Sequence, residues 1–306
     1  MNRANAVTVG LVVKNNENTI RDTIMSLLHQ DFPHERMNLV VVDGNSSDLT
    51  LHIIQNELSK SDLPFKILSE SFGLGFARQL VVNDALGDFI IWVDGDMLLS
   101  KDFVSKQVDF MEKNPKVGIA KGTLALKSMG NTLGTLETFS RAAGKMVDYQ
   151  SKKASSRVLG TSGCIYRTSA ILQVGGFAKD LRGYGEDWDL EIRVRAAGWL
   201  LTTTEAKFLD YERQGLSWKA LWSRYWRRGY DTHYFLHKNS GLIKHYKMFP
   251  PAAVLSGLLS AHKLFKITKK KIVFLLPFQY LFKMTAWYIG FFNGHIYSYE
   301  PKLQSV

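Results

Sequence analysis

Short apolar, β-branched runs alternate with amphipathic segments over the first 125 residues. The runs that predict strands are 7–13, 39–43, 65–68, 89–93 and 117–124. Between the first two runs, apolar residues recur at i, i+4, i+7 and i+8 from Ile20 to Leu28, which predicts a helix with one apolar face. The run 89–93 is apolar throughout, as expected of a strand covered on both faces. This alternation predicts an α/β fold in which a mostly parallel sheet carries helices on both faces.

The pattern changes after residue 125. Helices are predicted over 133–150, 170–174, 187–197 and 217–237, and a loop over 160–163. Two apolar stretches follow, 248–262 and 272–292, and several lysines separate them. No fixed-period repeat is present. We therefore expect one large α/β domain over 1–215 and a helical C-terminal segment over 216–306.

The excess of positive over negative charge lies in one part of the chain. The formal net charge is +11, and residues 207–271 hold 14 Lys/Arg against 3 Asp/Glu, whereas the remainder is balanced. Because this basic block is interleaved with Trp and Tyr and followed by apolar stretches, it favours a membrane surface over nucleic acid as partner. The N-terminus leads directly into a strand pattern without a cleavage site, so we expect no signal peptide.

The single cysteine, Cys164, limits the kinds of site that the chain can form. One cysteine excludes an intrachain disulfide framework and a multi-cysteine zinc site, and it fits a reducing compartment. We expect Cys164 to be a small buried residue.

Acidic residues follow two of the predicted strands. Asp43 closes the second run and Asp94 closes the fourth, with Asp96 two residues later. Ligands of open α/β sheets bind beyond the carboxyl ends of the strands, and carboxylate oxygens suit a divalent cation. A second acidic cluster at 185–191 could supply a carboxylate that accepts a proton. Turn formation, helix capping and favourable placement near a helix dipole are the alternative roles for such acids.

Several segments, in order along the chain, resemble family 2 glycosyltransferases of the GT-A fold. The segments are Val41–Asp48 (VVDGNSSD), Gly73–Arg78 (GLGFAR), Gly87–Asp96 (GDFIIWVDGD), Gly175–Phe177 (GGF), Gly185–Arg193 (GEDWDLEIR) and Gly198–Trp199 (GW). The likeness extends from residue 7 to roughly residue 235. It implies a GT-A catalytic domain with a nucleotide-binding half over 1–125 and an acceptor half over 126–215.

The resemblance also implies a donor site and a metal site. The residues that would bind the nucleotide sugar are Val13, Asn15, Asp43, Arg78 and Asp94. Asp96, together with Asp94, would bind Mn²⁺ or Mg²⁺. A divalent cation would neutralise the charge that grows on the departing diphosphate.

On the acceptor side, the resemblance implies that Asp187 is the base of an inverting reaction. Glu186 would orient the acceptor, and Thr161, Ser162 and Trp188 would belong to the acceptor loop. Without the other motifs, Glu186, Asp187 and Asp189 would read simply as acids in the first turn of a helix.

The chain departs from the family pattern at four points, the first being the loop 12–15, which reads VVKN where relatives commonly have PTYN. Gly44 replaces the second acid of the V-V-D-D segment, and Gln79 follows Arg78 where an asparagine is usual. Relatives often carry a histidine near position 211, whereas this chain has Tyr211 and Glu212, so no histidine ligand is assigned.

The C-terminal segment predicts contact with a membrane surface. Arg224, Arg227 and Arg228 could bind the departing diphosphate or a lipid-linked phosphate; an ordinary helix that packs its aromatic residues is the alternative. The stretch 272–292 is long enough to span a bilayer, but polar and small residues from Gln279 to Gly294 form one helical stripe. We favour peripheral or monotopic attachment at the cytoplasmic face of the membrane over a span, a re-entrant hairpin or a soluble helical cap.

The leading hypothesis is an inverting, metal-dependent glycosyltransferase that moves a hexosyl or N-acetylhexosaminyl group. UDP-sugars are favoured over GDP-sugars as donors, and the acceptor would be lipid-linked, in polysaccharide or glycolipid biosynthesis. A sugar-phosphate nucleotidyltransferase is the first alternative, but residues 10–20 lack the Gly-rich basic loop that it needs. The second is a non-catalytic basic binder of membranes or nucleic acid, which would leave Asp94, Asp96 and Asp187 without a purpose.

Overall fold

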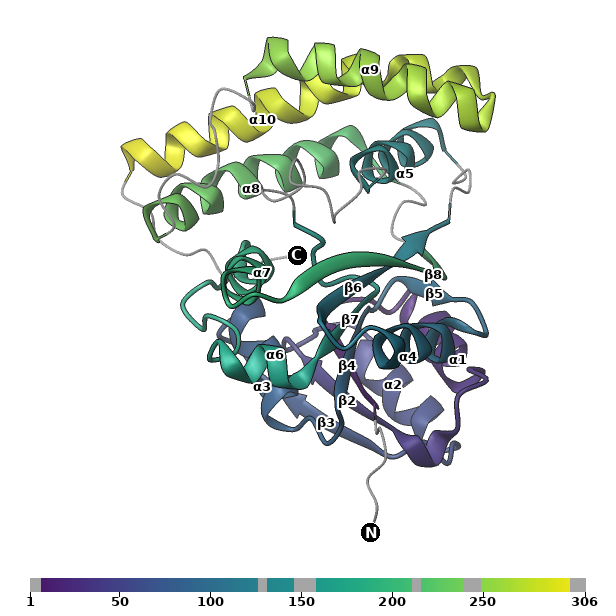
Figure 1. Cartoon of the computed structure of the whole chain (residues 1–306). Helices are drawn as coiled ribbons and strands as arrows, with labels where there is room; N and C mark the ends of the chain where they lie inside the picture. The colour runs from purple at the N-terminus through teal and green to yellow at the C-terminus, as the bar shows by residue number, and fades with distance from the viewer. Residues whose placement is uncertain (1–6, 126–130, 146–157, 211–215, 239–248, 298–306) are drawn as a thin grey trace. The chain divides into compact units, whose positions relative to one another are not determined.

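The computed structural model describes residues 7–125, 131–145, 158–210, 216–238 and 249–297. It divides into two units, the first formed by 1–125, 148–211 and 302–306 and the second by 126–147 and 212–301 (Figure 1). The second unit thus takes in 126–147, a segment that the sequence pattern groups with the acceptor half. The functional boundaries at 125 and 215 stay predictions.

The first unit is built on an eight-stranded mixed sheet. Its strands are β1 (Val7–Val13), β2 (Met37–Asp43), β3 (Phe65–Ser69), β4 (Phe89–Asp94), β5 (Met97–Leu99), β6 (Val117–Leu124), β7 (Cys164–Arg167) and β8 (Leu200–Asp210). Their order is β3-β2-β1-β4-β7-β6-β8-β5. The strands β3, β2, β1 and β4 are parallel, as are β6 and β8, while β7 is antiparallel to β4 and β6 and β5 is antiparallel to β8. The predicted mostly parallel sheet is confirmed.

Three strands of this sheet are absent from the sequence prediction. β5 and β7 have three and four residues, too few for a periodicity to stand out. β8 has eleven residues, and from Thr202 to Phe208 it alternates between buried and exposed positions. That period of two is typical of a half-buried strand, but the sequence carries it only from Glu205 to Phe208, where charged and apolar residues alternate.

Helices cover both faces of the sheet. The helices of the first unit are α1 (Ile20–Leu28), α2 (Thr50–Leu58), α3 (Leu74–Asn83), α4 (Phe103–Lys113), α6 (Thr168–Gln173) and α7 (Glu186–Ala196), with a short 3-10 helix at His34–Arg36. One hydrophobic core joins α1, α2 and α4 to the sheet, and a second core joins α3, α6 and α7 to the opposite face. The apolar face predicted for α1 is buried in the first core. Burial from both sides explains why β1 and β4 are apolar along their length.

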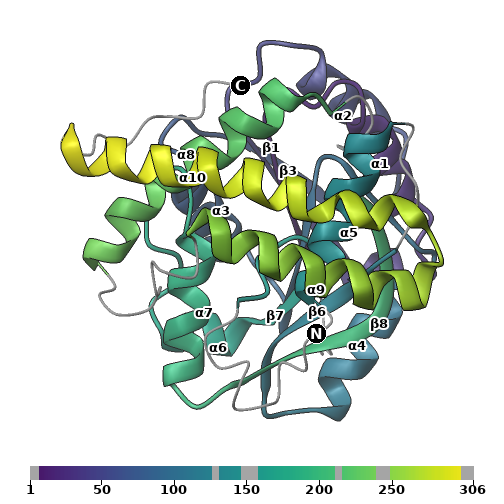
Figure 2. The ribbon, with the colours of Figure 1, turned by 90° about the horizontal axis from the view of Figure 1, so that it is seen from above.

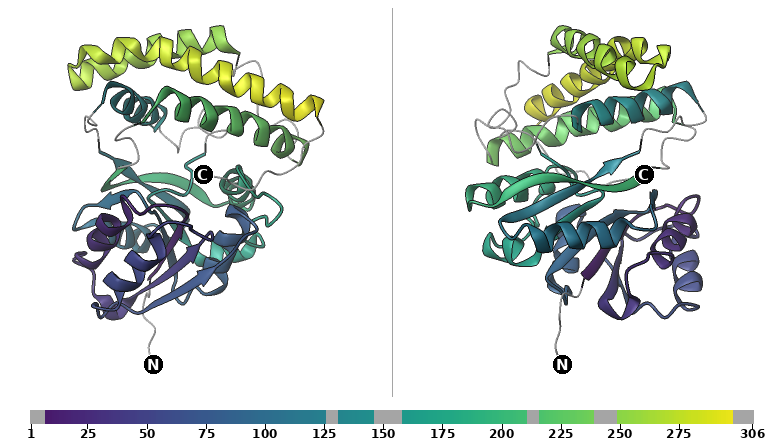
Figure 3. Two further views of the ribbon diagram at one scale, coloured as in Figure 1. Left: turned by 180° about the vertical axis from the view of Figure 1, so that it is seen from behind. Right: turned by 45° about the vertical axis from the view of Figure 1, so that its right-hand side comes forward.

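The second unit consists of helices. They are α5 (Thr132–Lys145), α8 (Trp218–Lys238), α9 (Pro250–Thr268) and α10 (Leu276–Ile296), with a 3-10 helix, η4 (Lys271–Leu275), between the last two. Figure 2 shows α9 and α10 running side by side, and Figure 3 shows them as one layer over α8 and α5. The helix predicted over 133–150 ends outside the described residues. The apolar stretch predicted from 272 begins as η4 and becomes α-helical at Leu276.

Glycines bring the backbones of α8 and α10 into contact. A Cβ added at Gly290 would lie 1.9 Å from the carbonyl oxygen of Trp226, and one added at Gly229 would lie 1.9 Å from that of Trp287. Real Cβ atoms cannot approach so closely, so any side chain at either position would force the helices apart. Trp218 and Trp222 of α8 also pack against Phe282 of α10, with ring centroids 4.8 and 5.1 Å away. Aromatic residues of α8 therefore serve packing within this unit.

A buried ion pair joins α5 to α10. The Lys283 ammonium lies 2.9 Å from Glu137 Oε2 and donates to Ser140 Oγ at 2.5 Å. Gln279 Nε2 and the Tyr225 hydroxyl donate to the two Glu137 oxygens at 3.2 and 3.3 Å. Burial alone would lower the pKa of Lys283, but Tyr225 and Glu137 outweigh it and raise the pKa above its ordinary value. The polar stripe of α10 thus faces protein.

This pair gives a test of the second unit. Lys283→Met leaves the Glu137 carboxylate buried without a counter-charge, and we expect a loss of about 3–5 kcal/mol in the free energy of unfolding. The double variant Glu137→Gln/Lys283→Met removes both charges and should lose clearly less. Urea unfolding followed by circular dichroism measures both variants. Equal losses would show that the charge pairing is not what stabilises this contact.

Candidate functional site

The sheet brings two of the predicted acids to one edge. β1 lies between β2 and β4, and its last residues pair with the ends of both: Val13 is opposite Asp43, and Val12 is opposite Asp94. All three strands run in the same direction, so both carboxylates lie at the carboxyl edge of the sheet. The order of strands therefore confirms the common edge that the sequence predicts.

Asp43 and Asn15 bind the same short loop. Asp43 is buried and accepts hydrogen bonds from the Ser46 amide at 2.9 Å and the Ser46 hydroxyl at 2.5 Å. Asn15 has a left-handed backbone with φ of +50°, its amide donates to Ser46 Oγ at 3.0 Å, and its Oδ1 accepts from the Ser47 amide at 2.9 Å. These bonds fix the loops after β1 and β2 against each other. Asp43 and Asn15, both predicted to bind the nucleotide sugar, therefore belong to one hydrogen-bond network.

Asp94 and Asp96 flank the tight turn between β4 and β5. The residue between them, Gly95, has no room for a side chain, because an added Cβ would lie 2.9 Å from atoms of Val13 and Asn16. The turn is therefore packed directly on the loop after β1. This packing places Val13, which is buried, and both acids in one small region.

The predicted acceptor loop reaches the same turn. Ser162 Oγ donates a hydrogen bond to Asp94 Oδ2. Gly163 is held by the bond from its amide to the Trp92 carbonyl at 2.9 Å. Thr161 is buried, so of the two loop residues predicted to meet an acceptor, Ser162 is the more exposed. The loop 160–163 thus lies against the end of β4.

The carboxylates at this edge fit a cation that takes its other ligands from a bound diphosphate. Among the described residues, no group of three or more His, Cys, Asp or Glu side chains is close enough to enclose a metal. Asp94 and Asp96 nevertheless offer two carboxylates within one turn. Mg²⁺ and similar ions commonly bind one or two carboxylates and take their remaining ligands from water and substrate phosphates.

Asp187 lies beside the other end of the same loop. It stands in the first turn of α7, whose N-terminal cap, Gly185, has a φ of +98°. Asp187 is half-buried, and the Trp188 amide donates to its Oδ1 at 2.9 Å. Its other oxygen, Oδ2, lies 3.4 Å from the position that a Cβ of Gly160 would take. Asp187 and Asp94 therefore meet the loop 160–163 at opposite ends.

Glu186 forms a buried ion pair with Arg78. The Glu186 carboxylate meets the Arg78 guanidinium, which comes from α3, and both side chains are buried. The resemblance to the family implies opposite substrates for these residues, with Arg78 at the nucleotide and Glu186 at the acceptor. In the structure the two side chains contact each other, so the pair joins α3 to the start of α7, next to Asp187 in the sequence.

Two further contacts hold the GGF segment, one from α7 and one from α3. Arg193 bonds to Asp189 Oδ2 at 2.6 Å and to the Gly176 carbonyl at 2.8 Å, so this i, i+4 pair also holds the GGF segment. Gln79 accepts a hydrogen bond from the Phe177 amide at 2.7 Å. The glutamine that stands in place of the usual asparagine therefore has a structural partner here.

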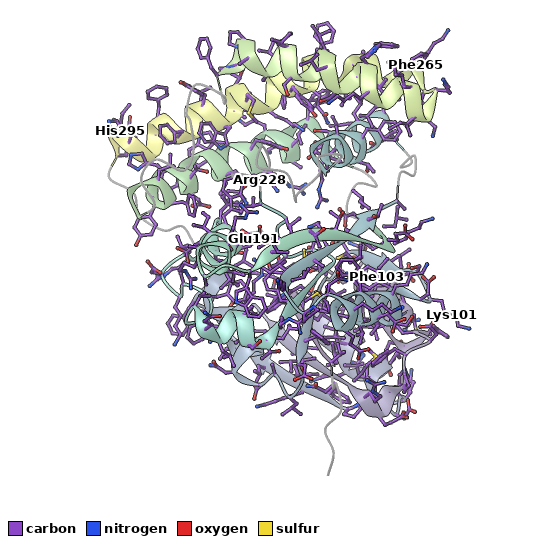
Figure 4. The ribbon with its side chains drawn as sticks, in the orientation of Figure 1. Lys101, Phe103, Glu191, Arg228, Phe265 and His295 are labelled. Carbon is purple, nitrogen blue, oxygen red and sulfur yellow. The ribbon has the colours of Figure 1, made fainter. Side chains whose placement is uncertain are left out.

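Glu191, to which the sequence motifs gave no role of its own, binds the backbone at the start of the loop 160–163. It is 0% exposed, and its two oxygens accept hydrogen bonds from the amides of Leu159 and Gly160, each at 2.7 Å (Figure 4). Lys121 of β6 donates to the Leu159 carbonyl at 2.6 Å. The peptide between Leu159 and Gly160 is thus bound through both its donor and its acceptor groups. Glu191 follows Asp187 by one helical turn, a spacing that could have suggested that both side chains share a face of α7.

The surroundings of Glu191 favour its protonated form. Burial raises its pKa most, the negative charge of Asp187 raises it further, and the two backbone amides and Lys121 lower it, with a net pKa of about 8. Tyr166 is affected in the same way: burial, followed by the Glu191 charge, raises its pKa well above the ordinary value.

Other predicted site residues have fewer contacts at this edge. Trp188 is half-buried and packs against Tyr184, with ring centroids 5.4 Å apart. Arg224, Arg227 and Arg228 lie on α8, in the second unit. Burial, followed by the charge of Arg228, lowers the pKa of Arg224. The role predicted for the three arginines in binding phosphate stays a prediction.

The raised pKa of Glu191 predicts a pH-dependent stability. The folded protein retains a proton that the unfolded chain releases near pH 4.5, so this group stabilises the fold fully below that pH. The contribution declines as the pH rises and is lost as it passes about 8. We expect the melting temperature of Glu191→Gln to fall less between pH 5 and pH 9 than that of the parent chain. The variant should also lose about 1–3 kcal/mol in the free energy of unfolding, because one hydrogen-bond acceptor for the loop amides is gone.

The matched control for this experiment is Glu205→Gln, because Glu205 is exposed on β8. Scanning calorimetry at the two pH values should give this control the pH dependence of the parent chain. A Glu191→Gln variant with an unchanged pH dependence would exclude Glu191 as the titrating group.

A family profile covers the part of the chain that carries this site. The profile described as glycosyl transferase family 2 matches residues 8–174, just over half of the chain. The poly-β-1,6-N-acetyl-D-glucosamine synthase of Staphylococcus epidermidis is 23% identical over 202 residues, 62% of this chain and 48% of that protein. The synthase of Staphylococcus aureus (strain MSSA476) is 24% identical over 191 residues, 61% and 46% of the two chains. The chain spans about half the length of these curated relatives.

Solved structures share the fold. The mannosyltransferase PcManGT from Pyrobaculum calidifontis, in complex with GDP-Man and Mn²⁺, has a TM-score of 0.67 at 16% identity, over 96% of this chain and 88% of its own. S. aureus TarS 1-349 in complex with UDP-GlcNAc has a TM-score of 0.53 at 15% identity, over 95% and 91%. At these identities the likeness concerns the fold, and it confirms the GT-A prediction.

Proposed function

Because the chain belongs to glycosyl transferase family 2, we propose that it transfers a sugar from a nucleotide-sugar donor to an acceptor hydroxyl, with inversion at the anomeric carbon. The observation that carries this proposal is the placement of Asp94 and Asp187 at opposite ends of the loop 160–163. In this proposal the nucleotide binds at the strand edge beside Asp94, and the acceptor approaches Asp187.

The chemistry follows from the separation of these carboxylates. Asp187 would accept the proton of the acceptor hydroxyl as that oxygen forms a bond to the anomeric carbon. The bond from this carbon to the diphosphate oxygen breaks on the opposite face, and the nucleoside diphosphate departs with its electron pair. Asp187 is half-buried, so it can meet a substrate, and its amide contact with Trp188 orients the carboxylate.

Asp94 and Asp96 would hold Mn²⁺ or Mg²⁺, which when bound neutralises charge on the diphosphate. Asp43 and Asn15, with the Val13 backbone, would position the nucleoside, because their hydrogen bonds set the two loops at the strand edge. Arg78 and Glu186 would act as positioning residues through their buried pairing. Family membership favours this activity over that of a sugar-phosphate nucleotidyltransferase.

The comparisons support a particular donor class. Two of the relatives are N-acetylglucosamine polymer synthases, and TarS is known in complex with UDP-GlcNAc. We favour a UDP-linked N-acetylhexosamine for this reason. PcManGT binds GDP-Man, so a GDP-hexose is the second candidate.

The acceptor in this proposal is lipid-linked, at the cytoplasmic face of the membrane, in polysaccharide or glycolipid biosynthesis. Within the described residues, the segment Lys271–Ile296 is the single helical segment long and apolar enough to cross a membrane, which is weak support by itself. Exposed apolar side chains on α9 and α10, such as Leu259 and Phe278, add to this support.

The base is tested by Asp187→Asn. Without a proton acceptor, transfer should fall by about 10²- to 10⁴-fold, while binding of the nucleotide sugar persists. Transfer of labelled sugar from UDP-GlcNAc to membrane extract and calorimetric titration with UDP measure the two properties. Asp109→Asn, an exposed acid on α4, is the control and should keep full activity. Unchanged turnover in Asp187→Asn would contradict the assignment.

The metal site is tested by Asp96→Ala. Loss of this carboxylate should weaken Mn²⁺-dependent UDP binding by about 100-fold, because the cation loses a direct ligand. A chelator should remove both binding and transfer in the parent chain. Activity that survives exhaustive chelation would show that the reaction needs no cation.

A further inference from the structure

Large apolar side chains cover one side of the layer formed by α9, η4 and α10. The residues are Leu255, Leu258, Leu259, Ile267, Phe274, Leu275, Phe278, Leu281, Ile289, Phe292 and Ile296. Each is between 39% and 71% exposed, and Figure 4 shows side chains projecting from these helices on the side away from α8 and α5. Soluble proteins rarely leave an apolar patch of this extent without a partner.

The charge on this layer has one sign. Residues 249–297 contain no Asp or Glu. The exposed lysines cluster from the second half of α9 to the start of η4: Lys263, Lys266, Lys269, Lys270 and Lys271. An apolar face bordered by cations alone complements a surface of acyl chains with anionic headgroups.

The contacts on the inward side of α10 argue against its being a conventional transmembrane helix. Lys283 and Gln279 face Glu137, and Gly290 touches the backbone of α8, so lipid cannot surround α10. Because α8 packs along α10, a spanning α10 would draw α8 into the bilayer with it. That helix carries Lys219, Arg224, Arg227, Arg228 and Asp231. Charges of this kind are costly in the hydrocarbon core.

We propose that the outward side of α9, η4 and α10 lies in the plane of an anionic membrane and binds its surface without crossing it. The proposal rests on the membrane-associated acceptor of the proposed function, and it names the surface and the lipid class. The apolar side chains enter the boundary between headgroups and acyl chains, and the lysines bind headgroup phosphates.

Vesicle flotation of the full chain tests the apolar contact. We expect binding to phosphatidylcholine vesicles that contain phosphatidylglycerol. Leu259→Gln/Phe278→Gln, at positions 60% and 71% exposed, should weaken this binding by about 100-fold. The matched control Leu86→Gln/Leu172→Gln changes side chains 56% and 61% exposed in the first unit and should bind as the parent does. A parent chain that does not bind, or a Leu259→Gln/Phe278→Gln variant that binds equally well, would overturn the proposal.

The lysines and the second possible occupant are tested in parallel. Lys263→Gln/Lys266→Gln/Lys271→Gln should lose about fivefold in affinity per lysine on anionic vesicles and little on pure phosphatidylcholine. Equal binding of the parent chain to both vesicle types would overturn the anionic preference.

A second copy of the chain is the other possible occupant of this surface, and sedimentation velocity detects it. If the parent chain forms a dimer and does not bind vesicles, and Leu259→Gln/Phe278→Gln dissociates that dimer, the surface serves self-association.

In-plane and spanning arrangements differ in which ends of α10 the solvent reaches. Lys271→Cys and Tyr297→Cys flank the helix at exposed positions, and the native Cys164 is buried. On sealed vesicles, an impermeant thiol reagent should label both introduced cysteines. Labelling at one end only would show a span.

The same vesicles separate this proposal from the proposed function. Asp187→Asn should bind them as the parent chain does. A parent chain that binds vesicles but transfers no sugar would refute the enzymatic proposal alone. Transfer to a soluble acceptor in a chain that does not bind vesicles would refute the membrane surface alone.

Discussion

The site depends on the two hydrogen bonds through which the Glu191 carboxyl group holds the amides of Leu159 and Gly160. They fix the start of the loop 160–163, and Lys121 fixes the adjoining carbonyl from the sheet. The loop then meets Asp187 at one end and Asp94 at the other. A buried carboxyl group with both oxygens bonded can set a loop more firmly than exposed contacts can, because water does not compete for its partners.

Buried polar contacts also fix the position of α10 in the second unit. The ion pair of Lys283 with Glu137, and the backbone contact at Gly290, commit one side of α10 to protein. What remains on the other side is apolar. Length and hydropathy alone would describe α10 as a membrane-spanning helix, whereas the partners of its polar residues describe a helix with two different sides.

The sequence predicted those parts of the molecule that depend on neighbours along the chain. Asp43 and Asp94 could be placed at one edge because each follows an apolar run. Asp187 could be placed at the start of a helix, and the role expected of it came from the resemblance to the family. The pairing of Arg78 with Glu186, the support from Glu191 and the strand β7 depend on residues distant in sequence. Residue types and spacing do not encode such partners. The ordered motifs nevertheless predicted the family and the fold.

The direction of β7 has a consequence for how the two carboxylates come together. β7 is antiparallel to β4, so the residues that precede β7 emerge where β4 ends. A parallel β7 of the same four residues would deliver them to the opposite edge of the sheet, about 13 Å away at the usual rise per residue. One reversed strand therefore lets a single short loop reach both Asp94 and Asp187, with no long excursion of the chain around the sheet.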